Sequence, residues 1–294
     1  MAGRFAPSPT SELHVGNLRT ALLAWLFARS SGRDFLVRIE DLDQARVAAA
    51  AGVAERQLAD LAALGIDHDG EVVRQSERLP LYAAALERLE VYECYCSRRE
   101  IAESAQAPQG DSDRPYPGTC RDLTQAERAA KRAVRPAALR VRAGGATWTV
   151  TDELYGRVTR EVDDFVLRRG DGTYAYNLAV VVDDGAQGVD QVVRGDDLLS
   201  SAPRQAWLAH QLGITPPAYA HVPLAVGPDG RRLAKRDGAV TMTDLAALGV
   251  TPAEVLARLA ASLGLTEVDE TVTPDSLLDR FDPAALPRDP WVVD

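Results

Sequence analysis

Residues 4–17 read RFAPSPTSELHVGN and run directly into a long apolar segment. The two prolines hold the first half of the stretch in an extended path. Asn17 is a good N-cap, and the apolar residues that follow recur with helical spacing until Gly32, which predicts the end of a helix. Because free backbone amides at a helix N-terminus attract phosphate, the stretch predicts a nucleotide site. An ordinary capped loop with one surface histidine is the alternative interpretation.

Residues 34–43 are the second segment that bears on the fold. They read DFLVRIEDLD, which predicts a buried strand followed by acids. Loop, helix and strand in this order are typical of the opening of a parallel nucleotide-binding sheet, in which ligands lie at the carboxyl ends of the strands. Glu40 and its neighbours are therefore candidates for binding a cationic group. Solvated turn residues are the alternative.

The rest of the chain alternates helical and strand-like patterns. Strands are expected within residues 139–169, in the first part of 189–198 and over 219–226. Helices are expected over residues 47–64, 79–92 and 124–135, then up to about 212, and beyond 242, with a last one at 274–281. The apolar run 178–182 is too short to separate a strand from a buried helix.

The composition predicts a large core and an acidic surface. Of the 294 residues 46% are hydrophobic, so two domains, or one with a sizeable insertion, are expected. No segment has the apolar length of a membrane span, and the N-terminus lacks a signal peptide's apolar centre, so a soluble cytoplasmic protein is expected. The net charge of −10 argues against non-specific coating of nucleic acid, but it does not exclude a local basic face.

The three cysteines of the chain, Cys94, Cys96 and Cys120, lie in one cluster. In a cytosolic protein such clustering favours a metal over a disulfide. Zinc takes four ligands and no histidine lies nearby, so Tyr116 is one candidate for an oxygen ligand; reduced, unliganded thiols are the alternative. The basic segment 124–135 predicts either a solvated helix face or a contact with an RNA backbone.

A basic cluster, RRLAKRDG at residues 231–238, follows the turn 227–230. Four cations within six residues, followed by glycine, indicate either an anion-binding loop or a plain basic loop. Lys235 stands out, because all but two of the 33 basic residues of the chain are arginines.

As an ordered pair, the two loops resemble the signature motifs of the class I aminoacyl-tRNA synthetases. The first is PSPT followed by HVGN at a helix start, and the second is RLAKR at residues 232–236. RFAPSPT, RIED at 38–41 and YNLAVVVDD at 176–184 are similar to the glutamyl branch. The resemblance covers nearly the whole chain and implies an α/β fold, with a Rossmann-like catalytic domain, a zinc-bearing insertion and a short C-terminal helical segment.

The length narrows this resemblance. A full glutamyl-tRNA synthetase has a helical anticodon-binding region after its catalytic part, and nothing of that size follows residue 250. The chain resembles the glutamyl-Q tRNA(Asp) synthetases, a family of catalytic halves that activates L-glutamate with ATP without tRNA and attaches it to the queuosine base in the anticodon of tRNA(Asp). A truncated synthetase that charges a tRNA 3′ end, and a non-catalytic paralogue that binds glutamate or adenylate, are the alternatives.

The resemblance implies four regions and no anticodon-binding domain. The two halves of the nucleotide-binding fold are expected at residues 1–92 and 139–242, the second with the second signature loop. The zinc-binding insertion, similar to an acceptor-binding region, is expected at 93–138, and the short helical segment at 243–294. The protein is expected to be a monomer.

The family's site residues carry over to matching positions. The resemblance implies a glutamate site made of Arg4, Ser8, Glu40, Tyr176 and Arg194. An acid suits the ammonium group of glutamate and arginines suit its carboxylates. The ATP site is implied to consist of His14, Gly16, Asn17, Arg232 and Lys235, with His14 and Lys235 as the catalytic residues. No protein nucleophile is needed, because the α-carboxylate of glutamate attacks the α-phosphate of ATP, which carries Mg²⁺.

The family also places a structural zinc ion on a set that matches Cys94, Cys96, Tyr116 and Cys120. One zinc per chain is therefore expected. The signatures depart from the family pattern at two places. Asn17 stands where the first motif has a second histidine, and Arg232 and Ala234 stand where lysine and serine are common. Because alanine lacks a hydroxyl, one phosphate contact is expected to be absent or supplied by backbone.

Overall fold

A seven-stranded sheet forms the centre of the computed structural model, which describes residues 1–97, 99–101, 116–231, 233, 240–267 and 270–293. The strand order is β3-β2-β1-β9-β10-β6-β7, and all neighbours are parallel except the β6–β7 hairpin. The bounds are β1 Ala2–Phe5, β2 Asp34–Ile39, β3 Val73–Arg74, β6 Thr147–Asp152, β7 Gly156–Glu161, β9 Val189–Gly195 and β10 Ala218–Val222. The expected α/β class is confirmed.

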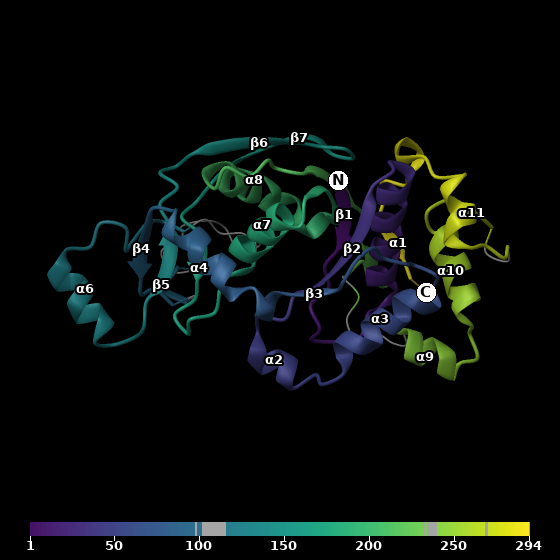
Figure 1. Ribbon diagram of the computed structural model, residues 1–294, viewed down its shortest axis with the longest axis horizontal. Helices are drawn as coiled ribbons and strands as arrows, with labels where there is room; N and C mark the ends of the chain where they lie inside the picture. The colour runs from purple at the N-terminus through teal and green to yellow at the C-terminus, as the bar shows by residue number, and fades with distance from the viewer. Residues whose placement is uncertain (98, 102–115, 232, 234–239, 268–269, 294) are drawn as a thin grey trace.

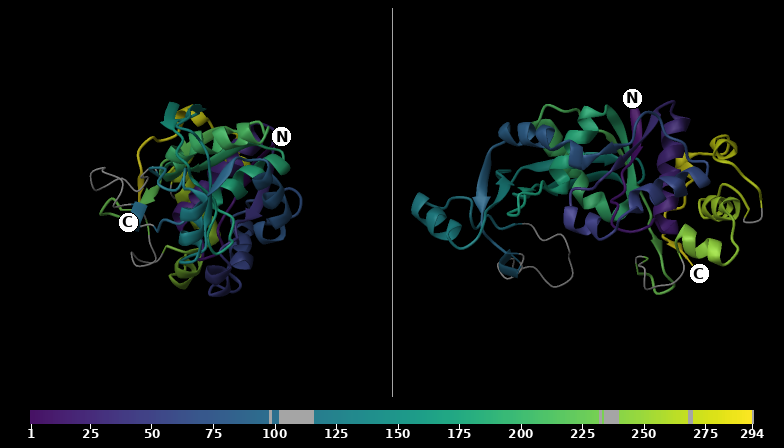
Figure 2. Two further views of the ribbon diagram at one scale, coloured as in Figure 1. Left: turned by 90° about the vertical axis from the view of Figure 1, so that its left-hand side faces the viewer. Right: turned by 60° about the horizontal axis from the view of Figure 1, so that its bottom comes forward.

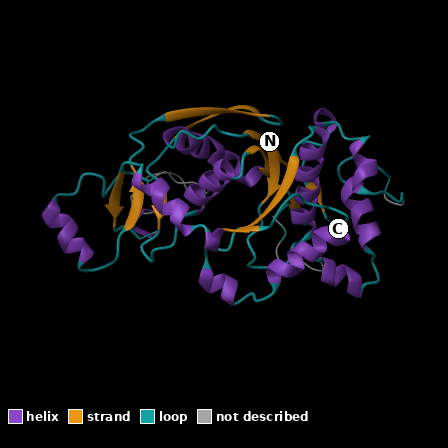
Figure 3. Ribbon diagram, in the orientation of Figure 1, coloured by secondary structure: helices purple, strands orange, loops and turns teal. Residues whose placement is uncertain are grey.

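Helices pack against both faces of this sheet (Figure 1; strands are orange in Figure 3). α1 (Val15–Ser30) contacts β1, β2 and β9, and its apolar side chains share one core with α10 (Pro252–Ala261) and α11 (Pro274–Leu278). α4 (Leu79–Glu87), α7 (Tyr176–Ala186) and α8 (Ala202–Gln211) form a second core. The apolar run 178–182, which the sequence left open, is thus part of a buried helix.

A smaller three-stranded antiparallel sheet lies at one end of the elongated molecule (Figure 2). It consists of β4 (Val91–Cys94), β5 (Ala138–Val141) and β8 (Val166–Arg168), with α6 (Gln125–Arg132) beyond it. α9 (Met242–Ala247), α10 and α11 lie at the opposite end. The large sheet, and the carboxyl ends of its strands, lie between these two ends.

Short elements complete the fold. They are the helices α2 Gln44–Ala48 and α3 Val53–Ala63, the 3₁₀ helices η1 Gln75–Glu77, η2 Asp196–Ser201 and η4 Pro283–Ala285, and the strands β11 Ala225–Val226 and β12 Trp291–Val292. β12, which the sequence did not predict, pairs in parallel with β11. This pairing fastens residues 291–292 to the chain segment that follows β10.

Several expected elements have different bounds. The single helix predicted over 47–64 is wrong, because Gly52 has φ 74° and separates α2 from α3. The helix predicted over 79–92 ends at Glu87, and its last residues begin β4. The strand predicted over 219–226 divides where Pro223, which has no backbone N–H, follows β10. The last helix ends at Leu278 instead of residue 281.

No helix within the described ranges is long and apolar enough to cross a membrane.

Candidate active site

A cavity of about 490 Å³ lies at the carboxyl ends of four strands of the large sheet. The loop that follows β1 and the start of α1 form one wall. Glu40 enters directly after β2, Arg194 comes from the end of β9, and Leu224 follows β10. Tyr176, the first residue of α7, completes the wall. This is the edge at which parallel sheets of the predicted class bind their ligands.

The N-terminus of α1 faces this cavity, but its cap differs from the prediction. His14, not Asn17, is the N-cap residue: its Nδ1 accepts a hydrogen bond from the backbone N–H of Asn17 at 3.2 Å. The Asn17 side chain accepts one from the backbone N–H of His14 in return, also at 3.2 Å. The two residues form a capping box, because an imidazole nitrogen with a free lone pair can replace the usual hydroxyl. Asn17 is therefore needed to set the conformation of His14.

Gly16 lies where no side chain fits. A Cβ atom there would lie 2.9 Å from the Cβ of Ala225 and 3.0 Å from the His14 ring. The backbone N–H groups of Val15 and Asn17 already have protein partners, whereas that of Gly16 has none among the residues described. Gly16 thus presents a bare backbone amide at the cavity wall, as a phosphate group requires.

The second signature loop lies beside the first where its flanks are described. The Val15 N–H donates to the Val240 carbonyl at 2.8 Å, and His14 forms a β-bridge with Thr241. Leu233 is buried in the same apolar core as Val15. Arg232, Ala234 and Lys235 themselves lie outside the described residues, so their predicted roles stay predictions. The described neighbours of that motif, Val240 and Thr241, thus lie at the start of α1, more than two hundred residues away in sequence.

Four of the five predicted glutamate-site residues line the cavity, namely Ser8, Glu40, Tyr176 and Arg194. The fifth, Arg4, is buried at the end of β1, and its Nε donates to Asp184 Oδ1 at 3.4 Å. It is not among the cavity-lining residues. What the structure shows of Arg4 at the cavity is the effect of its charge on Glu40, whose ionised form it favours.

Glu40 lies above a buried network of charges. The Arg38 guanidinium, which is fully buried, contacts Glu40 at 3.5 Å and Asp184 at 2.8 Å. Burial raises the pKa of Glu40, and Arg38 and Arg4 only partly offset this effect. Burial also acts on Asp184, but there the two arginines outweigh it and lower the pKa of that carboxyl. Asp184 therefore serves as the structural counter-ion, while Glu40 faces the cavity.

Glu40 is also fixed by its backbone, because its N–H donates to the carbonyl of Pro7 at 2.9 Å. Its neighbour Asp41 has a different role, since both of its carboxylate oxygens accept hydrogen bonds from Ser76. Of the acids after β2, Asp41 is thus a structural turn residue and Glu40 a cavity residue. The alternative of a solvated turn residue does not hold for Asp41, because it is only 5% exposed.

Gln57 is a site residue that the sequence interpretation missed. Its side chain is 1% exposed and donates from Nε2 to the carbonyls of Ser8 and Ser11, at 3.1 and 2.8 Å. It lines the cavity and fastens the loop after β1 to α3. The signal was available, because Gln57 is spaced four residues from both Val53 and Leu61, and all three are buried in α3.

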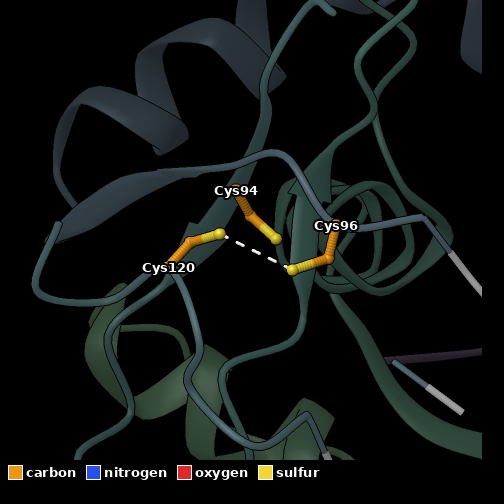
Figure 4. Close-up of side chains that lie close together, drawn as sticks. All are labelled: Cys94, Cys96 and Cys120. Carbon is orange, nitrogen blue, oxygen red and sulfur yellow. Dashed lines mark hydrogen bonds between the residues drawn. The ribbon is translucent and has the colours of Figure 1, made fainter. Parts of the chain in front are cut away.

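The cysteine cluster lies at the end of β4, away from the cavity. The sulfur atoms of Cys94, Cys96 and Cys120 point toward one another and lie within 4.8 Å of each other, with Cys96 and Cys120 at 3.6 Å (Figure 4). The Tyr116 hydroxyl lies 3.4 Å from the Cys94 sulfur and 3.7 Å from that of Cys96. All four predicted ligands are therefore brought together.

These distances fit a tetrahedral zinc ion. A Zn–S bond of about 2.3 Å and tetrahedral angles separate neighbouring sulfur atoms by about 3.8 Å. Burial raises the pKa of Cys96 to about 12, and the neighbouring thiols add to this effect. A divalent cation would reverse it, since coordination stabilises the thiolate. The cluster can hold a metal ion, with three thiolates and one phenol oxygen as its ligands.

Comparison with known proteins agrees with the fold. Residues 1–294 match the family model described as tRNA synthetases class I (E and Q), catalytic domain. A glutamyl-Q tRNA(Asp) synthetase of Nocardia farcinica is 61% identical, over 99% of this chain and 93% of the relative. That of Cutibacterium acnes is 56% identical, over 97% of this chain and 85% of the relative.

Solved structures extend the comparison. A glutamate tRNA ligase of Elizabethkingia meningosepticum, in complex with its amino acid, superposes with a TM-score of 0.82 at 25% identity. The match covers 100% of this chain and 67% of that one. The chain belongs to the family of class I tRNA synthetases (E and Q), and within it to the glutamyl-Q tRNA(Asp) synthetases.

Proposed function

We propose that this chain activates L-glutamate with ATP, without tRNA, and transfers the glutamyl group to the queuosine base in the anticodon of tRNA(Asp). The names of its full-length relatives support the acceptor. The observation that carries the choice of amino acid is Arg194, a buried cation at the cavity wall with no carboxylate partner among the described residues. A buried cation without a counter-ion favours a ligand that brings its own carboxylate.

The opposite charges in the cavity suit the two ends of glutamate. Glu40 is the partner of the ammonium group, and Arg194 that of a carboxylate. Tyr176, whose hydroxyl accepts a hydrogen bond from Arg194 at 3.3 Å, and Ser8 add polar contacts. Arg4 remains part of the proposed glutamate site, where it adds positive charge near Glu40.

In the activation step a carboxylate oxygen of glutamate attacks the α-phosphorus of Mg-ATP, and pyrophosphate leaves. The amide of Gly16, with His14 and Asn17, binds the phosphates at the start of α1. Lys235 and Arg232 neutralise the charge that builds on the leaving pyrophosphate. A hydroxyl of queuosine then attacks the glutamyl carbonyl, and AMP leaves. The protein acts by positioning and electrostatics and forms no covalent intermediate.

The cysteine cluster holds one structural zinc ion per chain in this proposal. Cys94, Cys96, Tyr116 and Cys120 bind it, and it stabilises the small sheet, which we assign to RNA contact. The protein acts as a cytoplasmic monomer.

The acceptor assay tests this function most directly. Labelled glutamate should become attached to tRNA(Asp) that carries queuosine, and prior periodate oxidation of the queuosine should abolish the attachment. Labelling of queuosine-free tRNA(Glu) would instead identify a truncated synthetase that charges a 3′ end.

Pyrophosphate exchange tests the activation step separately. Exchange should depend on glutamate, proceed without tRNA and be lost in Lys235→Ala. A wild-type protein without any exchange would indicate a non-catalytic paralogue.

A further inference from the structure

The guanidinium of Arg194 is held by four neutral acceptors. Nε donates to His221 Nε2 at 3.0 Å, and Nη1 donates to Gln205 Oε1 at 2.7 Å and to the Tyr176 hydroxyl at 3.3 Å. Nη2 makes one long contact, 3.4 Å, with the Leu198 carbonyl. A guanidinium has five N–H groups, so the contacts with the described residues leave one hydrogen on Nη2 for a ligand.

The contact with His221 determines the protonation state of that histidine. Arginine has no acceptor, so Nε2 of His221 must carry the lone pair and Nδ1 must carry the hydrogen. Nδ1 lies 2.6 Å from Asp152 Oδ2, in a side chain that is fully buried. Burial lowers the pKa of His221, the charge of Arg194 lowers it further, and Asp152 only partly opposes these effects. The ring is therefore neutral and donates to the carboxylate.

Asp152 is itself fixed at the end of β6. Its Oδ1 accepts hydrogen bonds from the backbone N–H groups of Leu154 and Tyr155, at 2.9 and 3.0 Å. Its Oδ2 accepts one from the backbone N–H of His221 at 3.1 Å, in addition to the contact with the ring. Burial works against ionisation, but the hydrogen bonds outweigh it and lower the pKa of Asp152. A rigid carboxylate on one strand therefore orients a neutral imidazole on the next.

We propose that His221, oriented by Asp152, is a positioning residue that holds the guanidinium of Arg194 with its Nη edge toward the cavity, and so determines the affinity for the carboxylate of the amino acid. The inference rests on the proposed function in one respect, the identity of that amino acid. The neutral ring supplies an acceptor without neutralising the cation, whereas a carboxylate in its place would compete with the ligand.

Two near-isosteric variants separate this role from simple core packing. In His221→Gln the amide oxygen reaches the position of Nε2 and still accepts from Arg194. In His221→Asn the amide reaches only the position of Nδ1, so the contact with Asp152 survives and the acceptor for Arg194 is lost. Val222→Ala is the control for a general loss of stability, because this fully buried side chain lies on the other face of β10.

Glutamate binding is measured by calorimetric titration, and the KM values for glutamate and ATP by pyrophosphate exchange. His221→Asn should weaken glutamate binding by about tenfold or more, the effect of losing a hydrogen bond to a charged group, and leave the KM for ATP within about twofold. His221→Gln should retain most of the affinity. Val222→Ala should lower the unfolding temperature without changing the ratio of the two KM values.

Equal effects of His221→Asn and His221→Gln, or parallel changes in both KM values, would overturn the inference while the proposed function stands. A wild-type protein that binds no glutamate would overturn the proposed function, and this inference with it.

Discussion

Glu40 and Arg194 face the same cavity with opposite charges, and the protein maintains these charges in different ways. Among the described residues, Arg194 has only neutral neighbours within hydrogen-bonding distance, so its charge remains available to a ligand. Glu40 has Arg38 beside it, yet burial dominates and raises its pKa. The binding of an ammonium group therefore depends on pH more than the binding of a carboxylate.

The KM for the substrate glutamate should rise on acidification. The rise should begin at a pH above about 4.3, the ordinary pKa of a glutamate side chain. Since the folded-state pKa of Glu40 is raised, its charge is lost early as the pH falls, and with it the partner of the ammonium group. The same shift means that acidification relieves the cost of burying this charge, so binding weakens while the contribution of Glu40 to stability improves.

Pyrophosphate exchange at a series of pH values measures the effect. In Glu40→Gln the KM for glutamate should be high at every pH. It should lack the acid limb, which is the rise in KM on acidification expected of the wild type. Glu12, which also lines the cavity but pairs with Arg56 at 2.9 Å, provides the matched control, because Glu12→Gln should keep the limb. An unchanged limb in Glu40→Gln would exclude this role.

At the scale of elements, predicted zinc ligands form part of the buried core at one end of the small sheet. Among the described residues, the buried ones there are Tyr92, Cys94, Tyr95, Tyr116 and Cys120. The Arg140 guanidinium covers the Tyr116 ring at 3.7 Å, and the Tyr116 hydroxyl accepts from the Cys120 N–H at 2.8 Å. A small apolar cluster of this kind is commonly completed by a structural metal.

Wild-type protein should contain about one zinc ion per chain, and Cys96→Ser should lose it, because only three of the four ligands remain. Elemental analysis measures the zinc, and thermal unfolding should begin at a lower temperature in the variant. Tyr95→Phe, which removes a hydroxyl that donates to Glu93 at 2.7 Å and leaves all four ligands, is the control. A native protein without metal would refute the site.

At the scale of the whole molecule, Asp183 joins segments that are far apart in sequence. Its fully buried carboxylate accepts hydrogen bonds from Gln75, Arg78 and Tyr82, at 2.9, 2.6 and 2.7 Å. Arg38 of β2 lies 3.8 Å away. This one side chain of α7 thus connects η1 and α4 to β2, the strand that ends directly before Glu40.

Asp183→Asn should lower the free energy of unfolding by about 3–5 kcal/mol, because Arg78 loses the carboxylate with which it pairs and the new amide cannot accept all the buried hydrogen bonds from Gln75 and Tyr82. Urea unfolding at neutral pH measures this loss. Asp190→Asn is the matched comparison: its carboxylate pairs with Arg33 at 3.0 Å but is 35% exposed, so the expected loss is at most about 1 kcal/mol. Similar losses in the two variants would show that the buried carboxylate of Asp183 contributes no more to stability than a partly exposed ion pair.

The sequence by itself determined the class of the fold, the two signature motifs and the cysteine cluster, because these follow from local spacing and from short motifs. Its resemblance to the glutamyl branch implied the set Ser8, Glu40, Tyr176 and Arg194, and all four line one cavity. Tertiary structure decided the rest. The helix over 47–64 was divided by the backbone of Gly52, and the run at 178–182 became a helix through burial in a core.

Only the folded chain brought Asp152, His221 and Arg194 into one line of hydrogen bonds, since they come from three different strands or strand ends. No local pattern encodes such a contact. It depends on which strands are neighbours in the sheet, and that order is decided by how the helices on both faces bury their apolar sides.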